Sequence, residues 1–149
     1  MDQGENTVKT LNQKNNQNGA AAVEFAIVLP LLVTLVFGII EFSILFYNKA
    51  MITNASREGA RAGIVYAYPN RMSDAEIESV VDTYCGNNLI TFGSGTHTPS
   101  VTVTRSGNET GDDLTVTVGY HYDFLVLPNF ISTLMGGLNL SAVTVMRME

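Results

Sequence analysis

The sequence contains few of the residues from which catalytic and metal sites are usually built. Cys85 is the only cysteine among 149 residues, so no disulfide can form within the chain, and a lone cysteine is usually a small buried apolar residue. His97 and His121 are the only histidines, and the spacing of zinc ligands is absent. A nucleophilic Cys85 paired with either histidine would rest on composition alone. We therefore predict no enzymatic activity, no metal site and no cofactor.

Positive charge is also scarce. Eight Lys and Arg residues stand against fourteen Asp and Glu residues, which gives a formal net charge of -6, and the basic residues occur singly rather than in runs. Binding to nucleic acid depends on clustered basic side chains that neutralise phosphates. The sequence therefore predicts no nucleic-acid partner.

Apolar residues are nearly absent from the first 18 positions. Only Met1, Val8 and Leu11 are apolar there, and Asn and Gln predominate. Such a segment cannot bury enough surface to offset the entropy lost on ordering. We therefore predict that this hydrophilic leader is disordered, and the composition changes abruptly at Gly19.

Residues 20–47 form a long apolar segment. Residues 25–40 carry no charge, and the whole segment exceeds the roughly 20 residues that a helix needs to cross a bilayer. A helix on the surface of a soluble protein would show a polar stripe, and a domain of this size could scarcely bury such a rod. The segment is also too long for the apolar region of a signal peptide, about 7–15 residues, and no A-x-A site follows it. We predict one transmembrane helix over 20–47.

Three residues interrupt the apolar pattern. A carboxylate at the centre of a bilayer costs about 2.5–3.5 kcal/mol, but less near the ends of a span. We interpret Glu41 as the outer boundary, where its side chain reaches the interface. Glu24, five residues inside the segment, is not explained in this way. Pro30 removes a backbone hydrogen bond and is expected to bend or loosen the helix.

The residues around Gly19 resemble a known processing site. In type IV prepilins a glycine ends a hydrophilic leader and a glutamate follows five positions later at the head of an apolar helix, as Gly19 and Glu24 do here. The segment GAAAVEFAIVLPLL resembles the corresponding segment of the TadE-like minor pilins or pseudopilins of tight-adherence (Tad/Flp, type IVc) pilus systems. Residues 55–63 (ASREGARAG) and 142–147 (AVTVMR) are similar to the helix after the membrane segment and to the closing strand in that family.

This resemblance implies a cleavage. A prepilin peptidase would cut between Gly19 and Ala20, so that the leader 1–19 is removed. Glu24 would become the fifth residue of the mature chain and, with Phe25, would set the register of helix packing by pairing with the N-terminal amine of a neighbouring subunit. A cation and a carboxylate at the membrane edge both need a partner. The implied partners are the peptidase, other pilin and pseudopilin subunits, the inner-membrane assembly platform and the lipid bilayer.

The resemblance also implies a location. The chain would cross the bacterial cytoplasmic (inner) membrane once, with residues 48–149 outside the cytoplasm and with or without entry into the pilus. The positive-inside rule does not by itself favour this orientation, because Lys9 and Lys14 are offset by Asp2 and Glu5. Three basic residues follow the apolar segment: Lys49, Arg57 and Arg61. Two alternatives stay open, an uncleaved single-pass scaffold or binding protein of a secretion or pilus apparatus, and a membrane-tethered enzyme.

The pattern after the apolar segment predicts two helices. The first continues over 48–65, and small residues on one face allow close packing against the chain's own domain or against another subunit. These small residues are Ala55, Gly59, Ala62 and Gly63. Ser73-Asp74-Ala75-Glu76 is typical of a capping box, so a second helix is predicted over 74–85 with Gly86 as its stop.

From Asn87 the period changes from helix to strand. Alternating β-branched residues predict strands within 98–104, 114–122 and 138–148, with a hairpin loop over 106–113. Adjacent carboxylates in that loop, Asp112 and Asp113, could hold calcium, but such pairs are usually solvated. The fold predicted is α+β: a long transmembrane helix that extends into a small domain with a second helix and an antiparallel sheet of about three strands.

Overall fold

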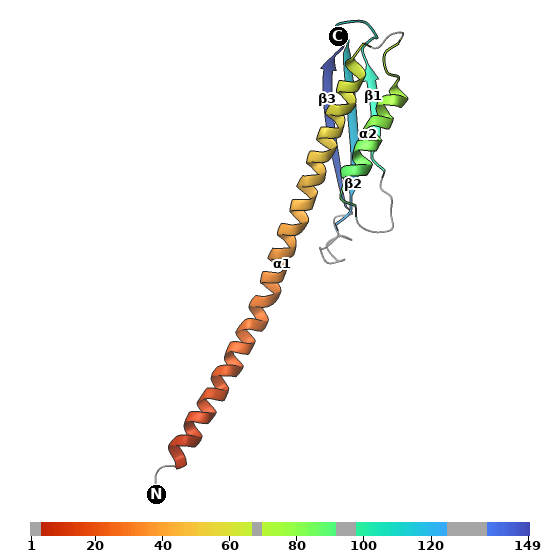
Figure 1. Cartoon of the computed structure of the whole chain (residues 1–149). Coiled ribbons are helices and arrows are strands. Elements are labelled where there is room, and N and C mark those ends of the chain that lie inside the picture. The colour runs from red at the N-terminus through yellow and green to blue at the C-terminus, as the bar shows by residue number, and fades with distance from the viewer. Residues whose placement is uncertain (1–3, 67–69, 92–97, 125–136) are drawn as a thin grey trace. The chain divides into compact units, whose positions relative to one another are not determined.

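The computed structural model describes residues 4–66, 70–91, 98–124 and 137–149, with residues 4–18 described by their backbone (Figure 1). Two helices, α1 (Gly4–Ile64) and α2 (Asp74–Asn88), precede three strands, β1 (Ser100–Arg105), β2 (Asp113–Tyr122) and β3 (Leu138–Arg147). The α+β prediction is confirmed. The chain forms two compact units, Met1–Ile39 and Ile40–Glu149, and α1 contributes to both.

In the first unit α1 begins at Gly4, so the prediction of a disordered leader is wrong. Residues 5–18 contain neither proline nor glycine. The apolar helix after them supplies a nucleus, and each residue added to an existing helix gains a hydrogen bond, whereas Asn and Gln disfavour a helix by less than about 0.7 kcal/mol each. The small amount of apolar surface in residues 1–18 was therefore not sufficient to predict whether this segment forms a helix. The helix continues through Pro30, and the Thr34 hydroxyl donates to the Pro30 carbonyl at 2.8 Å.

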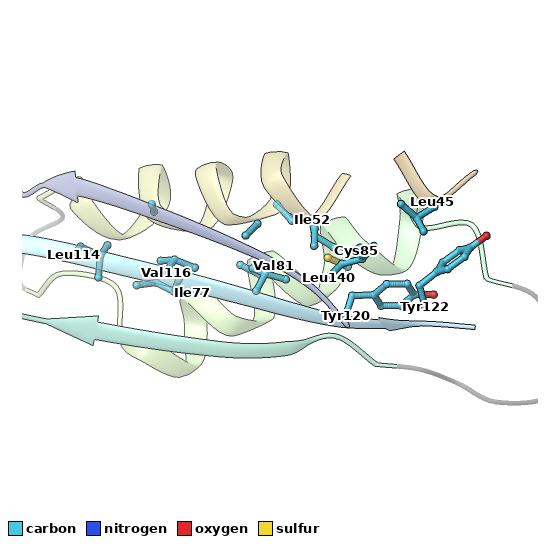
Figure 2. Close-up of a cluster of buried hydrophobic side chains, with 14 of the residues drawn as sticks. Leu45, Ile52, Ile77, Val81, Cys85, Leu114, Val116, Tyr120, Tyr122 and Leu140 are labelled. Carbon is cyan, nitrogen blue, oxygen red and sulfur yellow. The ribbon is translucent and has the colours of Figure 1, made fainter. Parts of the chain in front are cut away.

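In the second unit the three strands form one antiparallel sheet in the order β1-β2-β3. Val116 of β2 pairs with Val103 on one side and with Thr144 on the other. Along β2 every second residue is buried, as the alternation predicts: Leu114, Val116, Val118, Tyr120 and Tyr122. Figure 2 shows this face of the sheet with Ile52 of α1 and Val81 of α2 directed toward it. Both helices therefore contribute to the same core.

The start of α2 is the predicted capping box. The Ser73 hydroxyl accepts from the Glu76 backbone N–H at 3.4 Å, and the Glu76 carboxylate accepts from the Ser73 N–H at 2.8 Å. The end differs from the prediction, because the helix passes through Gly86 and stops at Asn88. The Leu89 N–H donates to the Cys85 carbonyl at 2.9 Å, so the last turn is closed without a glycine in the left-handed conformation. The Asn88 side chain also donates to the Tyr84 carbonyl at 2.8 Å.

The small residues of α1 pack against the chain's own domain. A Cβ placed on Gly59 would lie 2.5 Å from Val81 Cγ2, and one on Gly63 would lie 2.5 Å from both Ile77 Cδ1 and Leu114 Cδ2. Glycine therefore lets α1 approach α2 and the sheet more closely than any other residue allows. The prediction for residues 125–136, a turn at Pro128-Asn129 and a short helical turn, lies outside the described residues.

Candidate functional site

The predicted processing and registry residues lie together on one exposed stretch of α1 in the first unit. Gly19, Ala20 and Glu24 are exposed, and Phe25 exposes 64% of its surface. A Cβ on Gly19 would meet no atom within 4 Å. Ala20 and Glu24 are four residues apart, so they share one face of the helix. The roles predicted for these four residues stay predictions.

The helix after Glu24 exposes apolar side chains on all its faces. The large apolar residues of this stretch that are at least 40% exposed are Phe25, Ile27, Val28, Leu29, Leu31, Leu32, Val33, Leu35, Val36, Phe37, Ile39 and Ile40. In water a continuous apolar surface of this kind marks an interaction site. This part of α1 is long and apolar enough to cross a membrane, and its backbone groups are satisfied within the helix. It fits a membrane anchor.

The character of α1 changes at Glu41, where the second unit begins to bury one of its faces. Glu41 is fully buried and accepts a hydrogen bond of 2.6 Å from the Tyr122 hydroxyl at the end of β2. The Glu41 side chain is therefore directed into the domain and does not extend freely toward the interface, whereas the position of Glu41 at the outer boundary of the span stays a prediction. Burial, together with the bond to the Glu41 carboxylate and its charge, raises the pKa of Tyr122. The Glu41 carboxylate is thus bound by a residue that lies 81 positions away in the sequence.

Two more polar side chains of α1 are fully buried on the same face. The Asn48 amide bonds the backbone of Ile90 twice, as donor at 2.8 Å and as acceptor at 2.9 Å. The Ser56 hydroxyl bonds the Thr53 carbonyl at 2.9 Å and the Thr144 hydroxyl of β3 at 2.7 Å. We call this face of α1 the buried stripe; its residues are Glu41, Leu45, Asn48, Ile52, Ala55, Ser56, Gly59, Ala60 and Gly63.

The first half of the buried stripe, from Glu41 to Ile52, was not predicted from the sequence, although a signal for it exists. Glu41, Leu45, Asn48 and Ile52 follow one another at spacings of four, three and four residues, which place them on one face of a helix. Two of the four are polar, so a pattern of apolar residues alone does not find it. Their spacing along the helix, regardless of whether the side chains are polar or apolar, marks where one face of α1 becomes buried in the domain.

Cys85 lies in the core and is poorly suited to be a nucleophile. Its side chain is fully buried, and burial together with the charge of Asp82 raises the pKa of the thiol to about 11. The thiolate is the reactive form. His97 lies outside the described residues. His121 faces away from the core, where Nδ1 lies 2.7 Å from Asn139 Oδ1 and Nε2 lies 3.3 Å from Asp123 Oδ1.

The state of Cys85 predicts resistance to alkylation. At pH 9.5 the folded thiol should stay protonated, whereas in the unfolded chain, with its ordinary value near 9, most of it is thiolate. We expect iodoacetamide to label the detergent-solubilised chain slowly and the urea-unfolded chain rapidly, as measured by mass spectrometry over time. Equal labelling rates in the two states would show that the thiol is accessible in the fold.

Several charged groups elsewhere on the domain contact other parts of the same chain. Arg105 contacts Asp74 at 2.7 Å, and Arg71 donates to the carbonyl oxygens of Ile64 and Glu149. These two guanidinium groups line a surface cavity of about 480 Å³ beside the start of α2. Among the described residues no group of three or more His, Cys, Asp and Glu side chains is placed to hold a metal ion. In the hairpin loop the Asp112 carboxylate accepts from the Glu109 N–H at 2.9 Å.

One comparison bears on these residues. Residues 19–61 match the family model of TadE-like proteins. The TadE-like segment thus runs from Gly19 through the exposed apolar stretch and most of the buried stripe. No curated protein and no solved structure matches the chain. The resemblance predicted from the sequence is confirmed for the TadE-like segment, which supports a component associated with a Tad pilus; its apolar helix fits a membrane anchor.

Proposed function

We propose that this chain is a minor pilin or pseudopilin of a Tad-type pilus, with a structural or assembly role rather than an enzymatic one. The observation that carries the proposal is the contrast along α1. Residues 23–40 expose apolar side chains on every face, while the buried stripe that follows is sealed inside the domain. An apolar helix left uncovered by its own domain can be surrounded by lipid first and by like helices afterwards.

The proposed processing step is cleavage between Gly19 and Ala20 by a prepilin peptidase at the cytoplasmic face of the inner membrane. The exposure of Gly19 supports this proposal. Cleavage would create a cationic amine at Ala20, one turn from the Glu24 carboxylate. Glu24 would then lie near the N-terminus of the mature helix, where a negative charge is favourable. A second subunit's amine is the partner that we propose for it, with Phe25 beside it in the packing register.

The remaining partners follow from this arrangement. The bilayer would hold the uncovered helix, other pilin or pseudopilin subunits would replace the lipid, and an inner-membrane assembly platform would receive the subunit. Residues 48–149 would lie outside the cytoplasm. The TadE-like match over residues 19–61 supports a place in such a system.

Cleavage is tested by the mass of the mature chain in cells that contain a prepilin peptidase. We expect a chain that begins at Ala20, and we expect Gly19→Val to retain Met1. The matched control is Gly38→Val, because glycines 19 and 38 lie in the same helix and a Cβ on either meets no atom within 4 Å. Processing of the Gly19→Val chain at the rate of the Gly38→Val chain would contradict the proposal.

The second candidate is an uncleaved single-pass scaffold or binding protein of the pilus or secretion apparatus. The distribution of charge favours it, because Lys49, Arg57 and Arg61 follow the apolar stretch and the two leader lysines are offset by acidic residues. An intact Met1 in cells that process other prepilins would support this candidate. Protease protection of residues 48–149 in intact cells would determine the orientation independently.

A further inference from the structure

The second unit begins with exposed aromatic side chains. Phe42, Phe46 and Tyr47 expose 54%, 67% and 40% of their surfaces, on the faces of α1 away from the buried stripe. Ile40, the first residue of this unit, directly follows the apolar stretch of the first unit in the chain. The covalent chain therefore places these rings immediately beyond the span.

The end of the sheet joins the same turns of α1. Tyr122, the last residue of β2, bonds Glu41, and its ring packs edge-on against Phe124 with 5.9 Å between centroids. Figure 2 shows Tyr122 beside Leu45 at this end of the core. Leu138, the first residue of β3, pairs with Tyr122 and remains 43% exposed. The chain from Phe124 to Met146 contains no charged residue in its sequence.

The buried Glu41 limits how far the bilayer can extend along α1. Residues 20–40 already give about 31 Å of helix, enough for the hydrocarbon core. If the hydrocarbon reached Tyr47, the Glu41–Tyr122 pair would carry the end of the sheet into it. The boundary therefore falls close to Ile40, and the rings of Phe42, Phe46 and Tyr47 come to the level of the lipid headgroups, where aromatic residues are enriched.

We propose that this end of the domain is a second membrane contact, in which Leu138 and Phe124 join Phe42, Phe46 and Tyr47 to rest on the lipid interface of the bilayer that α1 crosses. The contact rests on the membrane insertion of α1 in the proposed function. Lipid is the occupant because the five side chains named are large and apolar or aromatic, although Asp123 adjoins Phe124, and because those of α1 directly follow the span along the chain. The contact orients the domain on the membrane before any subunit packing.

Single tryptophans test the contact, because the sequence contains none. The full-length chain is reconstituted in phosphatidylcholine vesicles whose acyl chains carry bromine close to the headgroup. We expect Leu138→Trp to emit at shorter wavelength than in water and to be quenched. The matched control is Val145→Trp, on the same strand at the opposite end of the sheet and 58% exposed, which should be neither shifted nor quenched.

A third variant separates the two proposals. Val33→Trp reports on the span itself and should be quenched by lipid brominated deeper in the acyl chain. If Val33→Trp is quenched and Leu138→Trp behaves like Val145→Trp, the membrane contact of the domain is refuted while the anchor stands. If Val33→Trp is not quenched, insertion itself fails. A Leu138→Trp emission that shifts only at high protein density, without quenching, would indicate a second copy of the chain and would also refute the lipid contact.

Discussion

Replacing Gly59 with leucine is expected to lower the free energy of unfolding of the domain by about 3 kcal/mol. A Cβ at this position would lie 2.5 Å from Val81 Cγ2, 3.5 Å from Ile77 Cγ2 and 3.6 Å from Val116 Cγ1. Val81 is fully buried and β-branched, so its methyl group cannot move aside without displacing other core atoms. Helix α1 would have to separate from α2 and from the sheet together.

The matched control is the same substitution at Gly86. This residue lies within α2, is exposed, and a Cβ on it would meet no atom within 4 Å. Leucine favours a helix over glycine by about 0.5–1 kcal/mol, so Gly86→Leu should raise stability slightly. Urea unfolding of the full-length chain in detergent, followed by the near-ultraviolet circular dichroism of its tyrosines, compares the two. Equal unfolding midpoints would show that the close approach at Gly59 is not required.

Replacing Tyr122 with phenylalanine is expected to lower the free energy of unfolding by about 2 kcal/mol, the usual magnitude for a hydrogen bond to a charged group. The substitution keeps the ring and removes the hydroxyl that donates to the buried Glu41 carboxylate at 2.6 Å. The exposed Tyr47, replaced in the same way, is the control and should change little. In a double-mutant cycle with Glu41→Gln, non-additive losses measure the pair; strictly additive losses would contradict a direct interaction.

The Glu41–Tyr122 pair is expected to make the stability of the domain fall at alkaline pH. Burial and the bond to Glu41 raise the pKa of Tyr122 above its ordinary value near 10. Above that pH the unfolded chain has released this proton and the folded chain retains it, so the unfolded state binds fewer protons and stability falls as pH rises. Below pH 10 this contribution is fully present. In the Tyr122→Phe variant the decline should be shallower, and an unchanged decline would assign it to other groups.

Local patterns were sufficient for much of this fold. Alternation along 114–122 predicted which face of β2 is buried, and the spacing of Ser73 and Glu76 predicted the start of α2, because each depends on neighbours a few residues apart. Glu41 could not be placed in this way. Its partner, Tyr122, is distant in sequence, so within an apolar run the glutamate resembles a boundary residue. The stop predicted at Gly86 was wrong, since the Leu89 N–H still bonds the Cys85 carbonyl and the last turn extends past the glycine.

The residues of the candidate site likewise include some that could be predicted from the sequence and some that could not. The motif from Gly19 to Glu24 was recognisable because its residues are adjacent, and the family match includes it. The polar members of the buried stripe were not recognised, since they satisfy their hydrogen bonds with the backbone of Ile90 and with side chains of β2 and β3. Polar residues that recur on one face of an apolar helix, here at intervals of seven and eight residues, are therefore a useful indication of where such a helix meets its domain.

The three polar members of the buried stripe have a mechanical consequence. Glu41, Asn48 and Ser56 each bond a different partner, and each partner is fixed at its own position along the helix. A shift of α1 by one turn, about 5.4 Å, would therefore break all three contacts at once. A pull along the helix axis would therefore load these bonds in parallel and in shear, a geometry that resists force better than bonds opened one after another. A force applied to α1 would therefore be transmitted to β2 and β3 through the bonds of Glu41 and Ser56.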